Sequence, residues 1–136
     1  MKKILIGTHN KGKFKEISYL LSKKIKKVSP IQLKIKSPKE TGKTFKDNAE
    51  LKANYFSKFT KLSVISDDSG LCVKALGGRP GIYSARWAKK YGSFEKAMKF
   101  ILDKLKNEAD RSATFVCSLS LKVSGGKKIT VTGKIN

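Results

Sequence analysis

A short apolar run that ends in two adjacent aspartates is the most constraining feature of this sequence. Residues 62–71 begin with β-branched residues that favour a buried strand, and Gly70 marks the position where we expect that strand to break. Side chains alternate between the two faces of a strand, but residues at its end can both turn toward the crevice beyond the sheet. We therefore expect Asp67 and Asp68 to line a ligand-binding crevice together.

Two adjacent carboxylates resist joint ionisation, because like charges a few ångströms apart repel each other. A divalent cation removes that conflict, and Mg²⁺ is commonly held by one or two carboxylates together with water and substrate phosphates. The simpler interpretation is an Asx turn whose carboxylates are solvated. Taken alone, the Asp67-Asp68-Ser69-Gly70 step does not separate a magnesium site from such a turn.

The length and the charge limit the classes of protein to consider. The 136 residues are enough for one domain with a real core, so we expect a single domain over residues 1–136. A net charge of +21 favours polyanionic ligands, nucleoside triphosphates included. Only three of the 31 cationic residues are arginine, and the lysines are spread along the chain. Since base readout favours arginine, we expect no specific nucleic-acid partner.

Other residue types narrow the location and the metal chemistry. No segment is apolar enough for a signal peptide or a membrane span, so we expect no membrane association. Cys72 and Cys117 lack Cys-x-x-Cys spacing and lie in apolar contexts, which indicates buried free thiols in a reducing cytoplasm. The single histidine, His9, nearly excludes a histidine-rich zinc site.

Strand and helix patterns alternate along the chain and end in a hairpin. Helices are expected at about residues 12–23, after an N-cap at Thr44, and after an N-cap at Ser93. In the last of these helices the Phe, Met and Leu residues are expected to be core, because apolar residues recur there at helical spacing: Phe94, Ala97, Met98, Ile101, Leu102 and Leu105. Strands are expected at residues 3–7, up to Asp67, at 114–123 and at 129–132, with an edge strand broken by Pro30 within 25–36. This pattern predicts an α/β fold with a mixed central sheet, flanking helices and a C-terminal β-hairpin.

The turn at residues 8–13 joins a strand end to a helix N-terminus, where free N–H groups and the helix dipole favour phosphate. The alternative is an ordinary connection with capping residues.

Gly42-Lys43-Thr44 resembles the end of a P-loop, but Ser37 stands where the first glycine is required, so we reject a P-loop. Glu40 lies just before the helix that begins after Thr44, and Lys52 lies two turns inside that helix. Their simple interpretations are a dipole-complementing acid and a solvated lysine.

The combination of motifs is more informative than any one of them. The order is Thr8-x-Asn10-x-x-Lys13-x-x-Glu16, Glu40-Thr-Gly-x-Thr-Phe45-x-x-Asn48-Ala49, Lys52-Ala53, Ser66-Asp-Asp-Ser-Gly-Leu71 and Pro80-Gly81-x-Tyr83-Ser84-Ala85-Arg86. From Lys3 to about Gly133 the chain strongly resembles the inosine triphosphate pyrophosphatase family. The Thr-x-Asn and Pro-Gly-x-Tyr-Ser-Ala-Arg signatures argue against a septum-formation-type nucleotide pyrophosphatase.

The resemblance implies hydrolysis of ITP, dITP and XTP to the nucleoside monophosphate and pyrophosphate, which would cleanse nucleotide pools, and it implies a homodimer. It implies that Glu40, Asp67 and Asp68 hold Mg²⁺ and that Asp68 is the general base. The substrate contacts that it implies are Thr8, His9, Asn10, Lys11, Gly12, Lys13, Lys52 and Ser69.

Proteins of that family continue past the hairpin into a Gly-Tyr-Asp-Pro-Ile-Phe-like strand and a Ser-His-Arg segment, which grip the purine. This sequence ends at Asn136. We therefore expect a C-terminally incomplete domain that lacks the last strand and helix elements of the family and leaves a strand edge exposed. The alternative function is that of a truncated, inactive basic protein that binds nucleotide or RNA phosphates non-specifically.

Overall fold

The computed structural model describes residues 2–136, which divide into two compact units. The first unit contains the residues up to Asp68 together with Ser118–Val131. The second contains Ser69–Cys117 and Thr132–Asn136. Three long strands, β3 (Ser63–Val73), β5 (Ala113–Lys122) and β6 (Lys128–Ile135), contribute residues to both units.

The sheet of the first unit has the strand order β2-β1-β3-β5-β6. Strand β1 (Lys3–Ile6) pairs in parallel with β2 (Lys26–Val28) on one side and with β3 on the other. The short β2 lies at an edge, as the proline after it predicts. The mixed α/β fold predicted from the sequence is confirmed.

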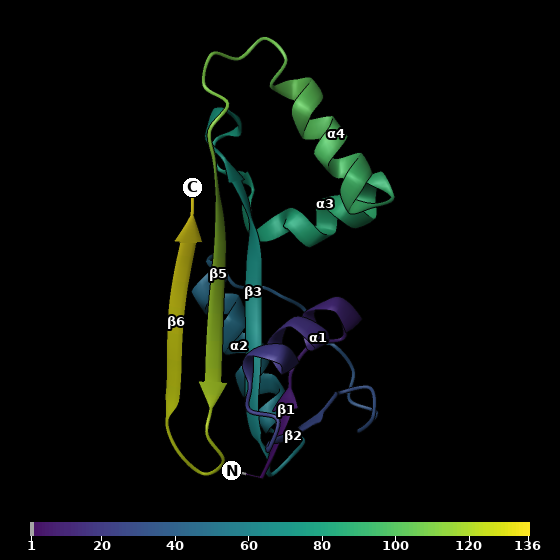
Figure 1. The fold of residues 1–136 in the computed structure, drawn as a ribbon, viewed down its shortest axis with the longest axis vertical. Helices are drawn as coiled ribbons and strands as arrows, with labels where there is room; N and C mark the ends of the chain where they lie inside the picture. Colours follow the sequence, from purple (N-terminus) through teal and green to yellow (C-terminus); the bar gives the residue numbers. More distant parts are fainter. Residues whose placement is uncertain (1) are drawn as a thin grey trace. The chain divides into compact units, whose positions relative to one another are not determined.

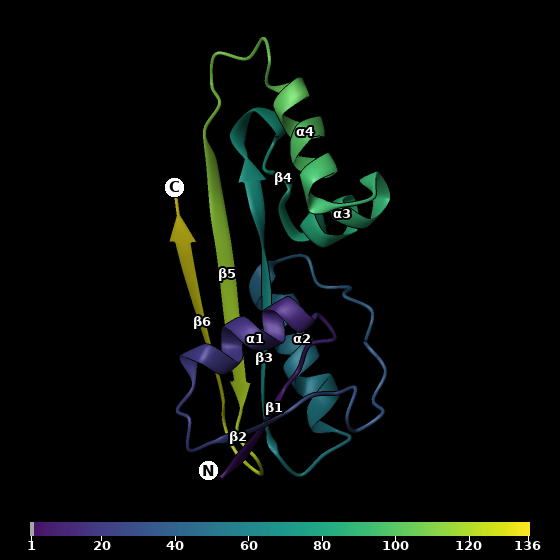
Figure 2. The ribbon, with the colours of Figure 1, turned by 45° about the vertical axis from the view of Figure 1, so that its right-hand side comes forward.

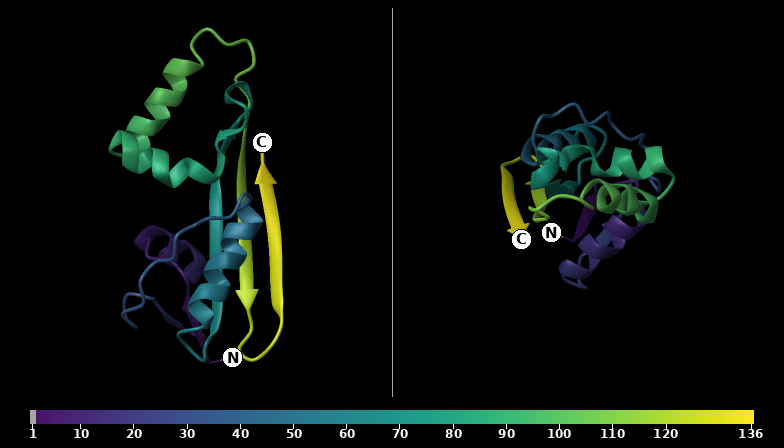
Figure 3. Two further views of the ribbon diagram at one scale, coloured as in Figure 1. Left: turned by 180° about the vertical axis from the view of Figure 1, so that it is seen from behind. Right: turned by 90° about the horizontal axis from the view of Figure 1, so that it is seen from above.

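Two helices cover opposite faces of this sheet (Figure 1, Figure 3). Helix α1 (Lys11–Leu20) lies on one face and helix α2 (Phe45–Ser57) lies on the other. The predicted N-cap at Thr44 is confirmed, because its side chain accepts a hydrogen bond from the Asp47 N–H. The core between α2 and the sheet is apolar and consists of Leu5, Ile35, Phe56 and Val64.

Strand β3 does not stop at the two aspartates, so the expectation that it breaks at Gly70 is wrong. The strand continues to Val73, and its last residues pair antiparallel with β4 (Arg79–Pro80). Pairing with β4 satisfies backbone groups that the glycine was expected to leave to a turn. Consequently Asp67 and Asp68 lie within a strand and point to opposite faces of the sheet.

The second unit carries the remaining helices (Figure 2). Two 3₁₀ turns, Lys74–Leu76 and Gly81–Tyr83, flank β4, and helices α3 (Ser84–Tyr91) and α4 (Phe94–Lys104) follow. The Ser93 cap is confirmed, whereas α3 was not predicted. The core of this unit contains Val73, Ile101 and Leu105. The expectation that the Phe, Met and Leu residues of this segment are core is confirmed for Leu105, which is 5% exposed. It is wrong for Phe94, Met98 and Leu102, which are 61%, 46% and 52% exposed, because the adjacent stripe of α4 is the buried one.

The predicted hairpin is confirmed, with Gly125 at a positive φ of 66° in the turn between β5 and β6. Strand β6 is the other edge of the sheet, and Ile129 and Val131 on it are more than half exposed. Cys72 and Cys117 form no disulfide within residues 2–136, and both are half-buried, so the expectation that the two thiols are buried is wrong. Within residues 2–136 every helix is too short or too polar to cross a bilayer.

Candidate functional site

The strand order places the end of β1 at a topological switch point. The chain leaves β1 through α1 on one face and returns to β3 through α2 on the other. Open α/β sheets bind ligands beyond the strand ends at such a point. Gly7, just after β1, donates its N–H to the Ile65 carbonyl at 2.7 Å and accepts from the Ser66 hydroxyl at 3.1 Å. The loop that follows β1 therefore starts beside Asp67.

The predicted phosphate loop is organised by its own side chains. Buried Thr8 accepts a hydrogen bond from the Asn10 N–H at 3.1 Å, and the Asn10 side chain caps α1 by accepting from the Lys13 N–H at 3.1 Å. Lys11 and Gly12 form the exposed first residues of α1. These two hydrogen bonds tie the loop to the start of α1.

Asp67 and Lys13 form an ion pair on the α1 face of the sheet. The Lys13 ammonium lies 3.3 Å from a carboxylate oxygen of Asp67, whose side chain is buried, and 3.9 Å from Glu16. A buried carboxylate requires such a partner, because an unpaired charge in a low-dielectric interior is costly.

Asp68 has a different set of neighbours, on the α2 face. The Asn48 amide donates to Asp68 Oδ2 at 3.2 Å, and Asn48 Oδ1 accepts from the Gly42 N–H at 2.7 Å. Beside them, the Lys52 ammonium pairs with Glu40 at 3.0 Å. Asn48 and Lys52 are four residues apart on α2, so they share one face of that helix.

The surroundings of Asp68 raise its pKa from the ordinary value of 3.8 to about 6. Burial of the side chain is the main cause, and the negative charge of Glu40 is the second. The Lys52 charge and the Asn48 hydrogen bond act in the opposite direction but are weaker. Asp68 is therefore a stronger base than an ordinary aspartate and is still mostly ionised at neutral pH.

The three predicted metal ligands are not gathered into one cluster. No three His, Cys, Asp or Glu side chains among residues 2–136 are placed to hold a metal ion together. Asp67 points to the α1 face, whereas Asp68 is influenced by Glu40 on the α2 face. The oxygen ligands of Glu40 and Asp68 fit Mg²⁺, which is commonly held by one or two carboxylates. A role for Asp67 in such a site stays a prediction.

His9 and Ser69 are two further predicted substrate contacts. His9 uses both ring nitrogens within the protein: Nε2 lies 2.8 Å from the Ile35 carbonyl and Nδ1 lies 2.9 Å from the Ser37 hydroxyl. Ser69 follows Asp68 in β3 and is half-buried. The site therefore brings Glu40, Lys52 and Asp68 together on one face and Lys13 with Asp67 on the other.

Asn48 is a site residue to which the sequence analysis gave no role. It is buried, and it links the loop before α2 to Asp68. Its helical spacing from Lys52 is the signal that could have placed it in the site.

A switch point between parallel strands, with one lysine–carboxylate pair on each face of the sheet, defines an α/β protein whose candidate site lies at the end of β1. Comparison with known sequences identifies the family. The sequence model of the Ham1 family matches residues 4–136, and the chain belongs to that family. The dITP/XTP pyrophosphatase of Zymomonas mobilis is 44% identical over 123 residues, which are 88% of this chain and 59% of that protein. The dITP/XTP pyrophosphatase of Caulobacter vibrioides is 40% identical over 98% of this chain and 70% of its own length.

Solved structures agree with the sequence comparison. The Ham1 protein of Staphylococcus aureus has a TM-score of 0.84 and 36% identity, over 98% of this chain and 70% of that one. A HAM1 protein from Coxiella burnetii has a TM-score of 0.85 and 32% identity, with 98% and 71% covered. The chain thus spans 59–71% of the length of these relatives.

Proposed function

We propose that this protein is a Mg²⁺-dependent pyrophosphatase of non-standard purine nucleoside triphosphates. The proposed substrates are ITP, dITP and XTP, and the products are the nucleoside monophosphate and pyrophosphate. The observation that carries the proposal is the buried Asp68, held by Asn48 beside the Lys52–Glu40 pair. The similarity to proteins named dITP/XTP pyrophosphatases supports the choice of substrate.

In the proposed reaction, water attacks the α-phosphorus of the substrate. The water gives its proton to Asp68 as its oxygen bonds to phosphorus, and the bond to the pyrophosphate leaving group breaks. Asn48 holds one carboxylate oxygen of Asp68, which leaves the other oxygen for the water. A positioned general base of this kind contributes about 10²–10⁴-fold to the rate.

The lysines and the loop after β1 have separate tasks. Lys13 and Lys52 supply positive charge for the polyphosphate, and each is held in place by a carboxylate while no substrate is bound. The N–H groups at the start of α1 are suited to a phosphate. Glu40 and Asp68 would hold Mg²⁺, which supplies positive charge that offsets the negative charge developing in the transition state.

We also propose, as the family resemblance implies, that the protein is a homodimer in the cytoplasm.

Product analysis tests this proposal. The chain is incubated with Mg²⁺ and with dITP, XTP, ITP or ATP, and the nucleotide products are separated by chromatography. We expect monophosphate and pyrophosphate, formed faster from the first three substrates than from ATP. Release of orthophosphate and a nucleoside diphosphate would contradict attack at the α-phosphorus.

Two lysines, one within α2 and one at its C-terminal end, provide a test variant and a matched control. Lys52→Met removes the charge beside Glu40 and is expected to lower pyrophosphate release strongly. Lys58→Met removes an exposed lysine from the C-cap of the same helix and should leave the rate unchanged. Equal rates in the two variants would remove Lys52 from the proposed site.

The net charge of +21 favours one alternative, a protein that binds phosphates without turnover. This alternative predicts no hydrolysis of any of the four nucleotides. It also predicts that the logarithm of the binding constant falls linearly with the logarithm of the salt concentration, whatever the base.

A further inference from the structure

Asp67 and Lys13 form a largely buried ion pair within the first unit, on the face of the sheet that carries α1. The Asp67 side chain is 5% exposed, and one of its carboxylate oxygens lies 3.3 Å from the Lys13 ammonium. Strand alternation turns the next residue, Asp68, toward Asn48 on the other face. The two neighbouring aspartates therefore have separate surroundings, although the sequence suggested one shared site.

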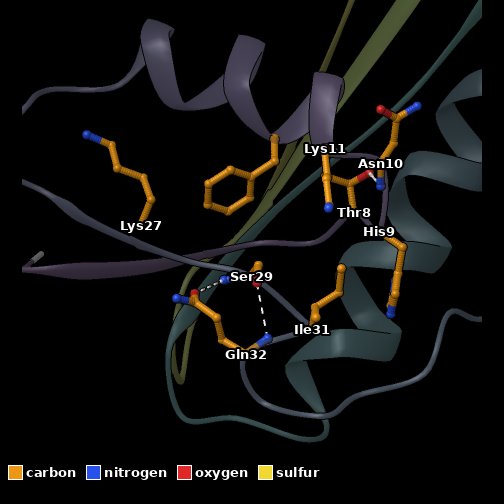
Figure 4. Close-up of a pocket in the computed structure, with 9 residues that line it drawn as sticks. Thr8, His9, Asn10, Lys11, Lys27, Ser29, Ile31 and Gln32 are labelled. Carbon is orange, nitrogen blue, oxygen red and sulfur yellow. Dashed lines mark hydrogen bonds between the residues drawn. The ribbon is translucent and has the colours of Figure 1, made fainter.

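Lys13 is fixed both at its backbone and at its ammonium. Its backbone N–H donates to the Asn10 side chain at 3.1 Å, and the Asn10 N–H donates in turn to the Thr8 hydroxyl in the loop that Figure 4 shows. The ammonium has a second carboxylate neighbour, Glu16, but that group lies 3.9 Å away and is 71% exposed. An exposed pair of this kind contributes little, because water competes for both charges. Asp67 is therefore the carboxylate that determines where the ammonium lies.

The position of the ammonium suits a ligand at the start of α1. Lys13 lies in the first turn of that helix, where backbone N–H groups and the helix dipole favour a phosphate. An ammonium carries three donors, so one lysine can serve a carboxylate and a phosphate oxygen at the same time. The pair with Asp67 need not break for a phosphate to bind.

The other role open to Asp67 is that of a metal ligand, which the family resemblance implies. Its neighbours do not support that role, because the Asp67 carboxylate faces a lysine whose charge compensates its own. The negative charge of Glu40, the third predicted ligand, acts on Asp68. In the part of the chain that the structure describes, no three side chains of the ligand types converge. Asp67 is thus better placed to hold the lysine than to bind a cation.

We propose that Asp67 is a positioning residue for Lys13 and not a ligand of the metal ion. This inference rests on the proposed function, in which Lys13 meets the polyphosphate of the substrate. It divides the two adjacent aspartates between two tasks: Asp68 takes the proton of the attacking water, and Asp67 holds the lysine. The ion pair persists in the nucleotide complex, where the ammonium donates to the carboxylate and to a phosphate oxygen together.

Metal binding without turnover separates the two roles of Asp67. Mn²⁺ is titrated into each protein, and the electron paramagnetic resonance signal of the free ion is followed. We expect the affinity to be unchanged in Asp67→Asn and at least tenfold weaker in Glu40→Gln. A tenfold loss in Asp67→Asn would overturn the inference. An unchanged affinity in Glu40→Gln would instead contradict the proposed metal site and leave the role of Asp67 standing.

A double-mutant cycle tests whether Asp67 acts through Lys13. Asp67→Asn should slow pyrophosphate release from dITP by about tenfold, since a displacement of about 1 Å can cost up to about 10²-fold. Added to Lys13→Met, the same substitution should cause no further loss. Glu16→Gln removes the exposed neighbour and should leave the rate unchanged. An unaffected rate in Asp67→Asn, or a further tenfold loss in the double variant, would overturn the inference.

The wild type supplies a test that depends neither on turnover nor on the folding of a variant. The ¹⁵N resonance of the Lys13 side chain is observed before and after addition of inorganic pyrophosphate, without Mg²⁺. A paired ammonium exchanges its protons slowly, so we expect a sharp signal that shifts on addition and stays sharp. Loss of the signal on addition would show that phosphate replaces Asp67 and would overturn the inference. Absence of dITP hydrolysis in the wild type, with this signal retained, would contradict the proposed function alone.

Discussion

Replacing Asp68 by asparagine is expected to stabilise the metal-free protein at the same time as it removes the proposed base. The pKa of Asp68 is raised to about 6 from an ordinary value of 3.8, mainly by burial and then by the charge of Glu40. Ionisation of this carboxylate therefore opposes folding. The difference between the two pKa values corresponds to about 3 kcal/mol at high pH.

The sign of the pH dependence follows from the same values. Below about pH 4 the carboxyl is protonated in the folded protein, and nearly the full stability is present. Between about pH 4 and pH 6 that stability is lost, because the carboxyl is ionised in the unfolded chain while the buried group still holds its proton, and above about pH 6 the loss is complete. The asparagine has no charge to bury, and its amide oxygen can still accept from Asn48. The pKa of about 6 already includes the attraction between Asp68 and Lys52, so we expect Asp68→Asn to gain about 1–3 kcal/mol at pH 8.

Urea denaturation in the presence of a chelator measures this gain. Asp68→Asn should unfold at a higher urea concentration than the wild type at pH 8, and the difference should nearly vanish at pH 4. Glu108→Gln removes one exposed carboxylate and so makes the same change in net charge, but it should show no gain. A gain that is absent at pH 8, or that is equal at both pH values, would refute the assignment of burial as the cause.

Two further substitutions test the framework of the loop after β1. Gly7→Ala places a methyl group against the Ser66 hydroxyl and should destabilise the fold by about 1–3 kcal/mol, whereas Gly126→Ala, with its nearest atoms 3.8 Å away, should be tolerated in thermal denaturation. His9→Phe keeps an aromatic ring but leaves the Ile35 carbonyl without its partner, which should cost about 1–3 kcal/mol in urea denaturation. An unchanged midpoint in His9→Phe would mean that water replaces the imidazole.

Local signals were sufficient to predict most of the elements. The caps at Thr44 and Ser93 and the hairpin at Gly125 were confirmed, because each depends on a hydrogen bond or a backbone conformation within a few residues. Helix α3 was missed because its eight residues are mostly polar or aromatic and carry no side-chain cap. The exposed stripe of α4 has the same helical spacing as its buried one, so periodicity could not separate them.

The arrangement of the site depends on contacts that a single sequence does not contain. The glycine after the aspartates suggested a strand end, but pairing with β4, a tertiary contact, carries β3 on to Val73. That continuation sends Asp67 toward Lys13 and Asp68 toward Asn48. The residue types of the site could therefore be predicted, whereas their distribution over two faces could not.

The most direct test of the catalytic role of Asp68 is the initial rate of pyrophosphate release from dITP with Mg²⁺, measured for the wild type and for Asp68→Asn. We expect the variant to be folded, which the urea denaturation proposed above checks, and to be slower by about 10²–10⁴-fold. Equal rates of pyrophosphate release by the two proteins would contradict the account.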